Sequence, residues 1–554
     1  MSPDHAELDP AGLAVLLARL AGVAEEGLAV LRRSASSPNI KERADCSTAL
    51  FSPEGELLAQ SESIPVHLGS MPASVRSVLD RLGPLEPGQQ AVVNDPYEGG
   101  THLNDVTVVA PVHHDGVLVG WVANRAHHAD VGGAAPGSIP ADATHIAQEG
   151  LRLPPVLLAT EVREIFLAAS RTPEERAGDL DAQAGANGVM AERLAEVVGE
   201  RWPLGEVLAY GERRMRAALH DLPDGTWTFT DVLDSTGAAG AQRDQATIVV
   251  AVTVAGGAIT FDFAGTDPQS GGNVNAVEAV TLSAVAFAIR SATDPTIPAN
   301  GGAMRPVTVV APAGSLVAAT FPAAVGAGNV EVSQRIADVC RGALAQVAPD
   351  RVGAADQGTM NNVLIGGAGT VAGGQQGWVY YETVAGGQGG RPAPGRHGQS
   401  GIHTGMTNTV NEVHRWDTPP KPGQSGIQTG MTNTQNTPVE ALERAYPLRV
   451  LRYRLRQGSG GAGLAAGGEG IERDLQVLED CTVSLITERR VSQPWGLAGG
   501  EPGAVGENWL LHGGEEGRAE RLPDKCTLRL RAGDVLRMLT PGGGGWAAPS
   551  RSEG

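Results

Sequence analysis

The sequence predicts a mixed α+β fold in which helices and β-strands occupy separate stretches of the chain. Near the N-terminus, leucine and valine recur at spacings of three and four, the pattern of an amphipathic helix. Between 225 and 265, Thr, Val and Phe alternate with polar residues, the pattern of half-buried strands. From about 445 onward, short Val/Leu runs alternate with glycine clusters, which predicts a β-rich C-terminal part with glycine-rich turns.

The remaining elements follow in chain order. A helix is expected over 11–34, and two short strands over 46–60 flank a Ser-Pro-Glu-Gly turn. Further helices are expected over 72–83, 186–220 with a break at Pro203, 275–291 and 332–347. We divide this large unit into an N-terminal region with the candidate site, a central α+β region and a β-rich C-terminal region, bounded as 1–205, 206–444 and 445–554.

Composition excludes several classes of protein. The chain has 42 Lys and Arg against 62 Asp and Glu, a net charge of −20, which argues against nucleic acid and anionic membrane surfaces as partners. The four cysteines form no CxxC pair, and the acidic N-terminus has no apolar leader. The sequence also lacks an uninterrupted apolar run of about 18 residues. These features predict a cytoplasmic protein.

Common nucleotide and hydrolase motifs are absent from the sequence. A phosphate-binding P-loop needs Gly-Lys-Ser/Thr, but none of the three lysines, Lys41, Lys421 and Lys525, follows a glycine. Neither GxSxG nor HExxH occurs. If the reaction uses ATP, we therefore expect the nucleotide on another chain.

Histidine and aspartate gather in one stretch, and a β-hairpin is expected to bring several of them together. Six of the thirteen histidines lie between 102 and 145. Strands over 105–112 and 117–126 flank an Asp115-Gly116 turn, since Asp-Gly favours the left-handed backbone of a two-residue turn. Pairing outward from this turn sets Asn104 opposite His127.

The two strand ends that meet in this hairpin form a candidate divalent-metal site. They carry His102, Asp105, His127 and His128. Imidazole and carboxylate ligands together suit Zn, Mn or Fe(II). Pro111 must lie at an edge or a bulge, and a slip of one or two residues in register would preserve the proximity. Surface polar residues without a metal are the alternative interpretation of the same pattern.

One internal duplication is present. GQSGIHTGMTNTVN begins at Gly398 and GQSGIQTGMTNTQN begins at Gly423, with twelve of fourteen positions identical. Two copies are too few for a solenoid. The Gly, Thr and Asn content predicts a long surface loop over 398–436.

The stretch rich in histidine and aspartate, together with several other blocks, resembles the hydantoinase B/oxoprolinase family. The blocks that carry the resemblance run in order over nearly the whole chain and include SPNIKERADC (37–46), HLGSMPASV (67–75), NDPYEGGTHLND (94–105), VANRAHHAD (122–130) and QEGLRLPP (148–155). Members of this family are the B-type subunits of ATP-dependent N-methylhydantoinases, 5-oxoprolinases and related lactamases. The resemblance implies a metal-dependent partner of an ATP-binding A-type subunit.

The resemblance also implies a set of metal ligands. These are the Asp of ERxD, the His and Asp of THLxD, and the first His of AHHAD, which here are Asp45, His102, Asp105 and His127. The last three are residues that the hairpin brings together. For Asp45, a turn cap before the 46–51 strand is the alternative.

Other residues in the matching blocks are candidates for supporting roles. Glu149 is a candidate general base, with a surface acid as the alternative. His128 is a candidate for proton shuttling or for orienting the site by a hydrogen bond, and a plain structural role is its alternative. Asp130 is a further candidate for supporting the ligands. Side chains that could support the site or line its pocket are Asn94, His67 and Tyr97.

Two features depart from the family pattern. Where the family's SGGAG block continues to Arg-Gly-Gly, this chain has Ala466-Gly467-Gly468, which removes a potential anion clamp. The duplication also separates the copy that contains His403 from the Asn436-Thr-Pro-Val-Glu440 segment, which the family joins in one unit.

These expectations point to a hydrolase of cyclic amides such as hydantoin, 5-oxoproline or a lactam. The metal would activate water for attack on the ring C–N bond, and ATP on the A-type partner would activate the amide. Two other functions remain open. One is a subunit of an ATP-dependent ketone carboxylase of the acetone or acetophenone type, and the other is a non-catalytic subunit that stabilises its partner.

Overall fold

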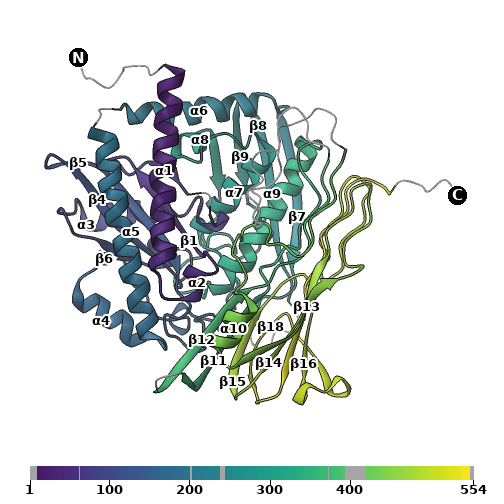
Figure 1. Cartoon of the computed structure of the whole chain (residues 1–554). Coiled ribbons are helices and arrows are strands. Elements are labelled where there is room, and N and C mark those ends of the chain that lie inside the picture. Colours follow the sequence, from purple (N-terminus) through teal and green to yellow (C-terminus); the bar gives the residue numbers. More distant parts are fainter. Residues whose placement is uncertain are drawn as a thin grey trace.

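The computed structural model describes residues 9–61, 63–199, 202–237, 244–371, 374–392 and 419–549. It is a mixed α+β structure, as the sequence predicts (Figure 1). In the described part of the chain, none of the helices is both long and apolar enough to cross a membrane.

The N-terminal region is built on a six-stranded sheet with the order β2-β1-β5-β4-β3-β6. Its strands are β1 Cys46–Phe51, β2 Leu57–Gln60, β3 Ala91–Val93, β4 Asp105–His114, β5 Val117–His127 and β6 Val156–Leu157. The helices around it are α1 Pro10–Ser34, α2 Pro38–Lys41, α3 Met71–Leu82, α4 Thr160–Ala169, α5 Pro173–Gly199 and α6 Leu204–His220.

Alternate residues of this sheet face two different helix layers. Leu50 of β1 packs with Leu20 of α1 and Met190 of α5. The helices α1 and α5 lie side by side in Figure 1. Its neighbour Phe51 packs on the other face with Val75 of α3. Because successive side chains of a strand point to opposite faces, β1 is buried on both sides. The sheet is therefore a rigid base for residues at its strand ends.

The central region packs two buried helices against a four-stranded sheet with the order β10-β9-β8-β7. The strands are β7 Gly225–Leu233, β8 Ala246–Ala255, β9 Ala258–Asp262 and β10 Val307–Val310, and the helices are α7 Glu278–Ala292, α8 Gly301–Met304 and α9 Ser333–Val347. Helix α9 begins directly after a π-helical turn, Gly328–Val332. Such turns are rare and often occur at functional sites.

The C-terminal region is a sandwich of two sheets with the orders β12-β11-β15-β18 and β13-β14-β19-β16-β17. Its elements are β11 Asn362–Val371, β12 Gly374–Thr383, α10 Val439–Ala445, β13 Leu448–Arg456, β14 Gly470–Val477, β15 Cys481–Ile486, β16 Glu507–Leu511, β17 Ala519–Leu522, β18 Lys525–Leu530 and β19 Val535–Leu539. Two of its strands thus come from before residue 445. Strand β12 carries residues from this sandwich toward the N-terminal sheet.

The glycine clusters of this region pack closely against one another. Of the ten glycines at which the sequence predicts turns, only Gly499 lies in a turn, with a left-handed φ of 91°. The prediction was wrong for the other nine, which are Gly460, Gly461, Gly467, Gly468, Gly500 and Gly542 to Gly545. A Cβ on Gly467 would lie 1.9 Å from the carbonyl oxygen of Gly543. The backbones are also joined, because Gly543 donates to the Gly468 carbonyl and Gly468 donates to that of Gln388. Glycine is required here for the close approach of neighbouring chain segments.

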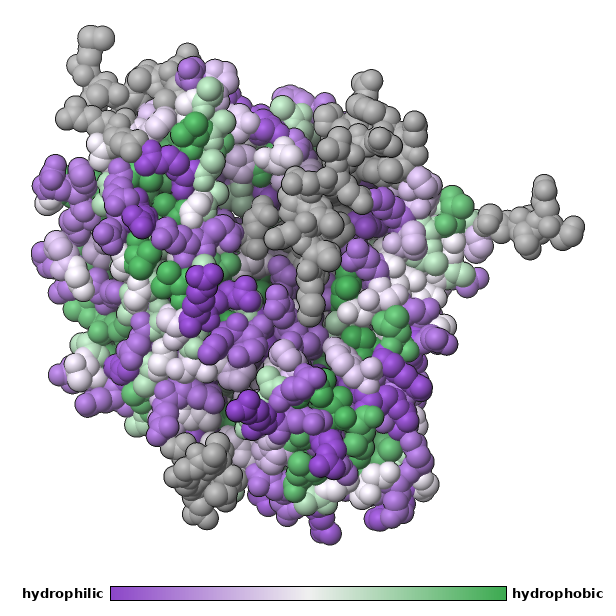
Figure 2. Space-filling model, in the orientation of Figure 1, coloured by the Kyte–Doolittle hydropathy of each residue, from purple (hydrophilic) through white to green (hydrophobic). Residues whose placement is uncertain are grey.

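Strand β13 forms one edge of the second sheet and carries exposed apolar side chains. Leu451, Tyr453 and Leu455 are each about half exposed. The arginines between them pair with acids of β14, since Arg452 and Arg454 both contact Glu472. Figure 2 shows hydrophobic residues at the lower right of the molecule, over the C-terminal sheets. Charged side chains of this kind protect an edge strand from pairing with other strands.

Candidate functional site

A small cavity with both polar and apolar lining residues lies where the N-terminal sheet, the π-helical turn and β12 meet. Its volume is about 20 Å³, room for one or two water-sized groups. The polar residues that line it are Asp45, His67, Asp105, His127, Asn329, Tyr381, Thr383, Thr432 and Thr434. All of them are buried. Three of the four predicted metal ligands are among them.

The hairpin forms with a register one residue away from the predicted register. Asp115 and Gly116 make the two-residue turn, with φ angles of 51° and 78°. A bulge between Val112 and His113, directly after Pro111, then shifts the pairing by one residue. The predicted pairing of Asn104 with His127 was therefore wrong, and Asp105 pairs with His127. The shift brings the carboxylate and the imidazole to the same position of the ladder.

Asp105 lies between two imidazoles. Its Oδ2 atom is 3.1 Å from Nδ1 of His102 and 3.5 Å from Nε2 of His67, and it accepts a 2.5 Å hydrogen bond from Thr101. Burial opposes ionisation of Asp105, but the two histidines hold its pKa well below the usual range. Its Oδ1 atom has no hydrogen-bond partner among the described residues.

His127 and Asp45 complete the acidic wall of the cavity, which we define as Asp45, Asp105 and His127. His127 stacks on Tyr381, with ring centroids 4.4 Å apart, and Asn39 contacts its Nδ1 atom at 2.9 Å. Its Nε2 atom has no partner among the described residues. Asp45 accepts a hydrogen bond at its backbone oxygen from His127, and burial raises the pKa of its carboxyl to about 7.

The donor set of the acidic wall suits a divalent metal, although its atoms are not gathered at ligating distances. Within the described ranges, no group of three or more His, Cys, Asp or Glu side chains converges as a metal site does. Two observations still fit a cation. Asp105 Oδ1 and His127 Nε2 are buried and unpartnered, and both residues line the same cavity. Buried polar atoms without partners are costly in a folded protein, and a ligand in this cavity would satisfy these two. His102 contacts Asp105 but does not line the cavity.

Comparison with known proteins identifies the family. The model of the hydantoinase B/oxoprolinase family matches residues 9–413 and 417–549, which is almost the whole chain. The chain belongs to the hydantoinase B/oxoprolinase family. The resemblance carried by the HLGSMPASV, THLND and NRAHHAD blocks is thereby confirmed.

Relatives in this family differ in chain length. An uncharacterized protein of Methanocaldococcus jannaschii is 37% identical over 98% of this chain and 91% of its own. The putative B-type subunit of a D-/L-hydantoinase from a Pseudomonas species is 30% identical over 100% of this chain and 93% of its own. The 5-oxoprolinase of Dictyostelium discoideum is 34% identical over 98% of this chain, which spans only 40% of that protein. The chain thus matches most of the shorter relatives and about two fifths of the longer ones.

Two solved structures share the fold of this hydantoinase B-type chain. The ATP-dependent caprolactamase from Pseudomonas jessenii aligns with a TM-score of 0.82 and 27% identity, over 98% of this chain and 91% of its own. The nucleotide-free structure of acetone carboxylase aligns with a TM-score of 0.84 over 98% of this chain and 76% of its own. At 18% identity, the second likeness concerns the fold alone.

The two predicted acid–base residues of this B-type chain lie outside the cavity lining. Glu149 is buried and accepts hydrogen bonds from the backbone of Val325 and Gly326. Burial raises its pKa to about 8. His128 contacts Gln183 of α5 at 2.9 Å and meets the edge of Phe166, and burial lowers its pKa to about 4. The hydrogen bonds of Glu149 and the contacts of His128 each join segments that are distant in sequence.

The other supporting candidates fix the loops next to the strand ends. Asp130 accepts hydrogen bonds from Gly132 and Gly137 and pairs with Arg171 at 2.9 Å. Asn94 joins two segments, because its side chain bonds the backbone of Leu103, Leu151 and Leu153. Tyr97 does not line the cavity and donates to the Ala323 carbonyl.

Several cavity residues were missed from the sequence. Asn329, from the π-helical turn, contacts His102 at 3.0 Å and Asp105 at 3.4 Å. Thr432 and Thr434 belong to the second copy of the duplication, so the predicted surface loop was wrong for this copy, while the first copy lies outside the described residues. Neither segment is near the hairpin in sequence. The duplication marks the segment of Thr432 and Thr434 but does not indicate that it meets the hairpin.

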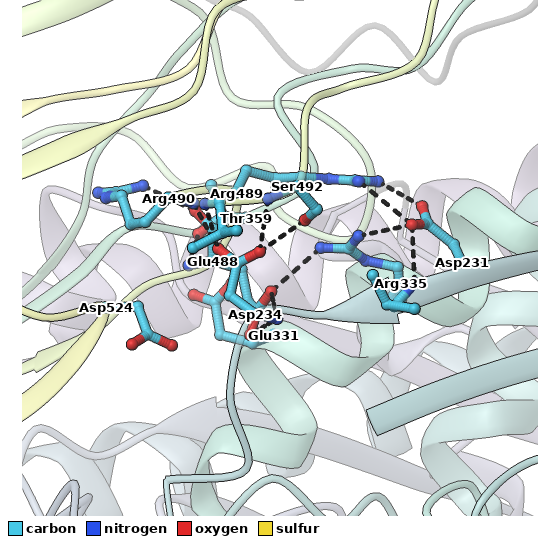
Figure 3. A network of polar contacts seen from close by, with 12 residues as sticks. Asp231, Asp234, Glu331, Arg335, Thr359, Glu488, Arg489, Arg490, Ser492 and Asp524 are labelled. Carbon is cyan, nitrogen blue, oxygen red and sulfur yellow. Dashed lines mark hydrogen bonds and ion pairs between the residues drawn. The ribbon is translucent and has the colours of Figure 1, made fainter. Parts of the chain in front are cut away.

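A second buried polar cluster, the Glu488 network, lies between α9 and the C-terminal sandwich (Figure 3). Glu488 pairs with Lys525 at 2.6 Å and with Arg335 at 3.2 Å. Asp231 contacts Arg335 at 3.1 Å and Arg489 at 2.7 Å. Most of these pairs join residues more than 100 positions apart, so sequence spacing does not reveal them.

Proposed function

We propose that this chain is the metal-dependent B-type subunit of an ATP-dependent enzyme that hydrolyses the ring C–N bond of a cyclic amide. The observation that carries the proposal is the acidic wall, where Asp45, Asp105 and His127 from three segments line one buried cavity. The names of its relatives support the substrate class, since they include 5-oxoprolinases, a putative hydantoinase component and a caprolactamase.

The chemistry follows from the stability of an amide. The bond resists water because of its resonance, so both the carbonyl and the attacking water need activation. A divalent metal such as Zn, Mn or Fe, held by Asp45, Asp105 and His127, would lower the pKa of a bound water toward about 7. His102 and His67 keep Asp105 ionised, and Asn329 holds both Asp105 and His102 in position. Burial of the wall excludes bulk water from the reacting groups.

The proposal includes a partner. The Pseudomonas relative is named as the B component of a hydantoinase, and the chain matches about two fifths of the 5-oxoprolinases. Both observations support an A-type partner that supplies the remaining part. We place ATP on that partner, because the sequence of this chain has no P-loop. The chain's four cysteines are all free, which supports a reducing, cytoplasmic setting.

The test is metal content and turnover of the complex between this chain and its A-type partner. We expect about one divalent metal per chain and ATP-dependent opening of hydantoin, 5-oxoproline or a lactam. In Asp105→Asn, metal content and turnover should fall together. Asp115→Asn, in the exposed turn of the same hairpin, is the matched control and should retain both.

The outcomes separate the alternatives. Full metal content with normal turnover in Asp105→Asn would overturn the assignment of the acidic wall. Turnover of a ketone that depends on bicarbonate, without cyclic amide hydrolysis, would indicate a carboxylase. An active complex that needs no metal in this chain would indicate a non-catalytic subunit.

A further inference from the structure

A second wall of the cavity is a row of three hydroxyl groups. They belong to Thr383, Thr434 and Thr432, and we call them the threonine wall. The hydroxyl oxygens of Thr383 and Thr434 are 2.5 Å apart, and those of Thr434 and Thr432 are 3.4 Å apart. All three side chains are buried, and all three residues line the cavity.

Two side chains, Arg43 and Gln428, donate hydrogen bonds to this row. Arg43 is fully buried, and its Nη2 atom donates to Thr383 at 3.0 Å and to Thr434 at 3.3 Å. A guanidinium has only donors, so both hydroxyl oxygens must accept. Gln428 Nε2 donates to the carbonyl oxygen of Thr383 at 3.1 Å and to its hydroxyl at 3.3 Å. That carbonyl can only accept, which determines the orientation of the amide.

Counting donors and acceptors then gives the row a direction. A hydroxyl has one proton and two acceptor sites. The acceptor sites of Thr383 are taken by Arg43 and Gln428, so Thr383 donates its proton to Thr434. Thr434 then accepts from Thr383 and Arg43, which leaves its own proton for Thr432 or for the cavity.

Either arrangement delivers an O–H donor into the cavity. If Thr434 does not donate to Thr432, its own hydroxyl proton is the donor in the cavity. If Thr434 donates to Thr432, the proton of Thr432 remains, and among the described residues the Thr432 hydroxyl has no other hydrogen-bond partner. The threonine wall therefore offers at least one donor, whereas the acidic wall offers Asp105 Oδ1, an acceptor without a partner among the described residues.

We infer that the threonine wall binds the carbonyl oxygen of the substrate, with Arg43 as the positioning residue that orients its hydroxyl groups. A carbonyl oxygen accepts hydrogen bonds, and it matches a cavity with room for one or two water-sized groups. This inference rests on the proposed function only in the choice of a cyclic amide as the carbonyl compound.

The duplication supplies a matched control for the test. Thr432 and Thr434 of the second copy correspond to Thr407 and Thr409 of the first copy, in the same local sequence Thr-Asn-Thr. A substitution in one copy can therefore be compared with the same substitution in the other. Valine removes the hydroxyl of threonine at nearly constant shape, and serine retains it.

The experiment measures binding by calorimetry to the complex of the full chain with its A-type partner. The probes are 5-oxoproline, hydantoin, 2-pyrrolidone and acetone, all of which carry a carbonyl group. We expect Thr434→Val to weaken the affinity for the probe that binds by about three- to tenfold, the usual loss for one hydrogen bond. Thr434→Ser, which keeps the hydroxyl, should recover most of the affinity that Thr434→Val loses. Thr409→Val should bind within about twofold of the wild type, a smaller change than the loss of one hydrogen bond.

Each outcome decides the inference. Equal binding by Thr434→Val and wild type, or equal losses in Thr434→Val and Thr409→Val, would overturn it, as would a wild-type complex that binds none of the probes. If the wild type binds acetone but no cyclic amide, the proposed function fails while the Thr434→Val comparison still tests the threonine wall. Thermal melting of each variant shows whether weaker binding reflects loss of fold.

Discussion

The Glu488 network and the acidic wall are both buried and both carboxylate-rich, but they are satisfied in different ways. In the network, Glu488 faces Lys525 and Arg335, so its charge has partners of opposite sign. In the acidic wall, Asp105 has histidine neighbours, and one of its oxygens has no partner in the part of the chain that the structure describes. The charge of Glu488 is balanced within the fold, which indicates a structural role, whereas Asp105 lines a cavity in which a ligand could reach its free oxygen.

Breaking the network should have the largest effect on stability. Glu488→Ala would leave Lys525 and Arg335 buried without a carboxylate between them. We expect a loss of about 3–5 kcal/mol in the free energy of unfolding, measured by chemical denaturation. Glu520→Ala removes an exposed acid from the same region and should cost less than about 1 kcal/mol. Similar costs for the two variants would contradict a structural role for the network.

Breaking the acidic wall should affect activity more than stability. Asp105→Asn removes the negative charge from a cavity in which Asp105 Oδ1 and His127 Nε2 have no hydrogen-bond partner among the described residues. Turnover should fall by about a hundredfold or more, since loss even of outer partners of a metal site costs about 10–100-fold. The unfolding free energy should change less than in Glu488→Ala. A larger loss of stability than of turnover would place Asp105 with the structural charges.

Glu149 is an intermediate case, because among the described residues its buried carboxyl meets backbone amides and no cation. Its pKa is raised from 4.5 to about 8 by burial. A raised pKa means that the folded state holds the proton more tightly, so stability should fall as pH rises from about 4.5 to 8. Between pH 5 and pH 7 the wild type should lose about 2 kcal/mol relative to Glu149→Gln. An identical pH profile for the two proteins would show that Glu149 does not titrate in this range.

His128 tests whether residues next to the cavity take part in the reaction. Its contacts are Gln183 and Phe166, and its neighbour His127 faces the cavity instead. We expect His128→Gln to lower kcat by less than about tenfold. Loss of a general acid or base would lower kcat by about a hundredfold or more. A larger fall in kcat with unchanged melting temperature would support the proton shuttle suggested by the sequence.

The smallest effect is expected from removing the first copy of the duplication. Deletion of residues 396–420 leaves four residues between Arg391 and Lys421, whose backbones are hydrogen-bonded to each other. The second copy, which lines the cavity, remains whole. We expect the unfolding free energy to change by about 1 kcal/mol or less and turnover to persist. Loss of turnover in a folded deletion variant would show that the two copies act together.

Local sequence determined much of the secondary structure. Apolar spacing predicted the helix α1, and the Asp115-Gly116 turn predicted the hairpin that carries Asp105 and His127. These signals depend on neighbours within a few residues, so a single sequence contains them. The family resemblance extended the candidate set to Asp45, which lies outside the hairpin.

Tertiary structure decided how these elements meet. The bulge after Val112 sets Asp105 opposite His127, and a one-residue shift of this kind depends on packing against both faces of the sheet. Glycine-rich sequence suggested turns and a surface loop, but its lack of Cβ atoms instead permits close packing between segments. Asn329 and Thr434 reach the cavity from segments more than 200 residues beyond the hairpin. No local signal encodes that meeting, because it arises only when the three regions pack together.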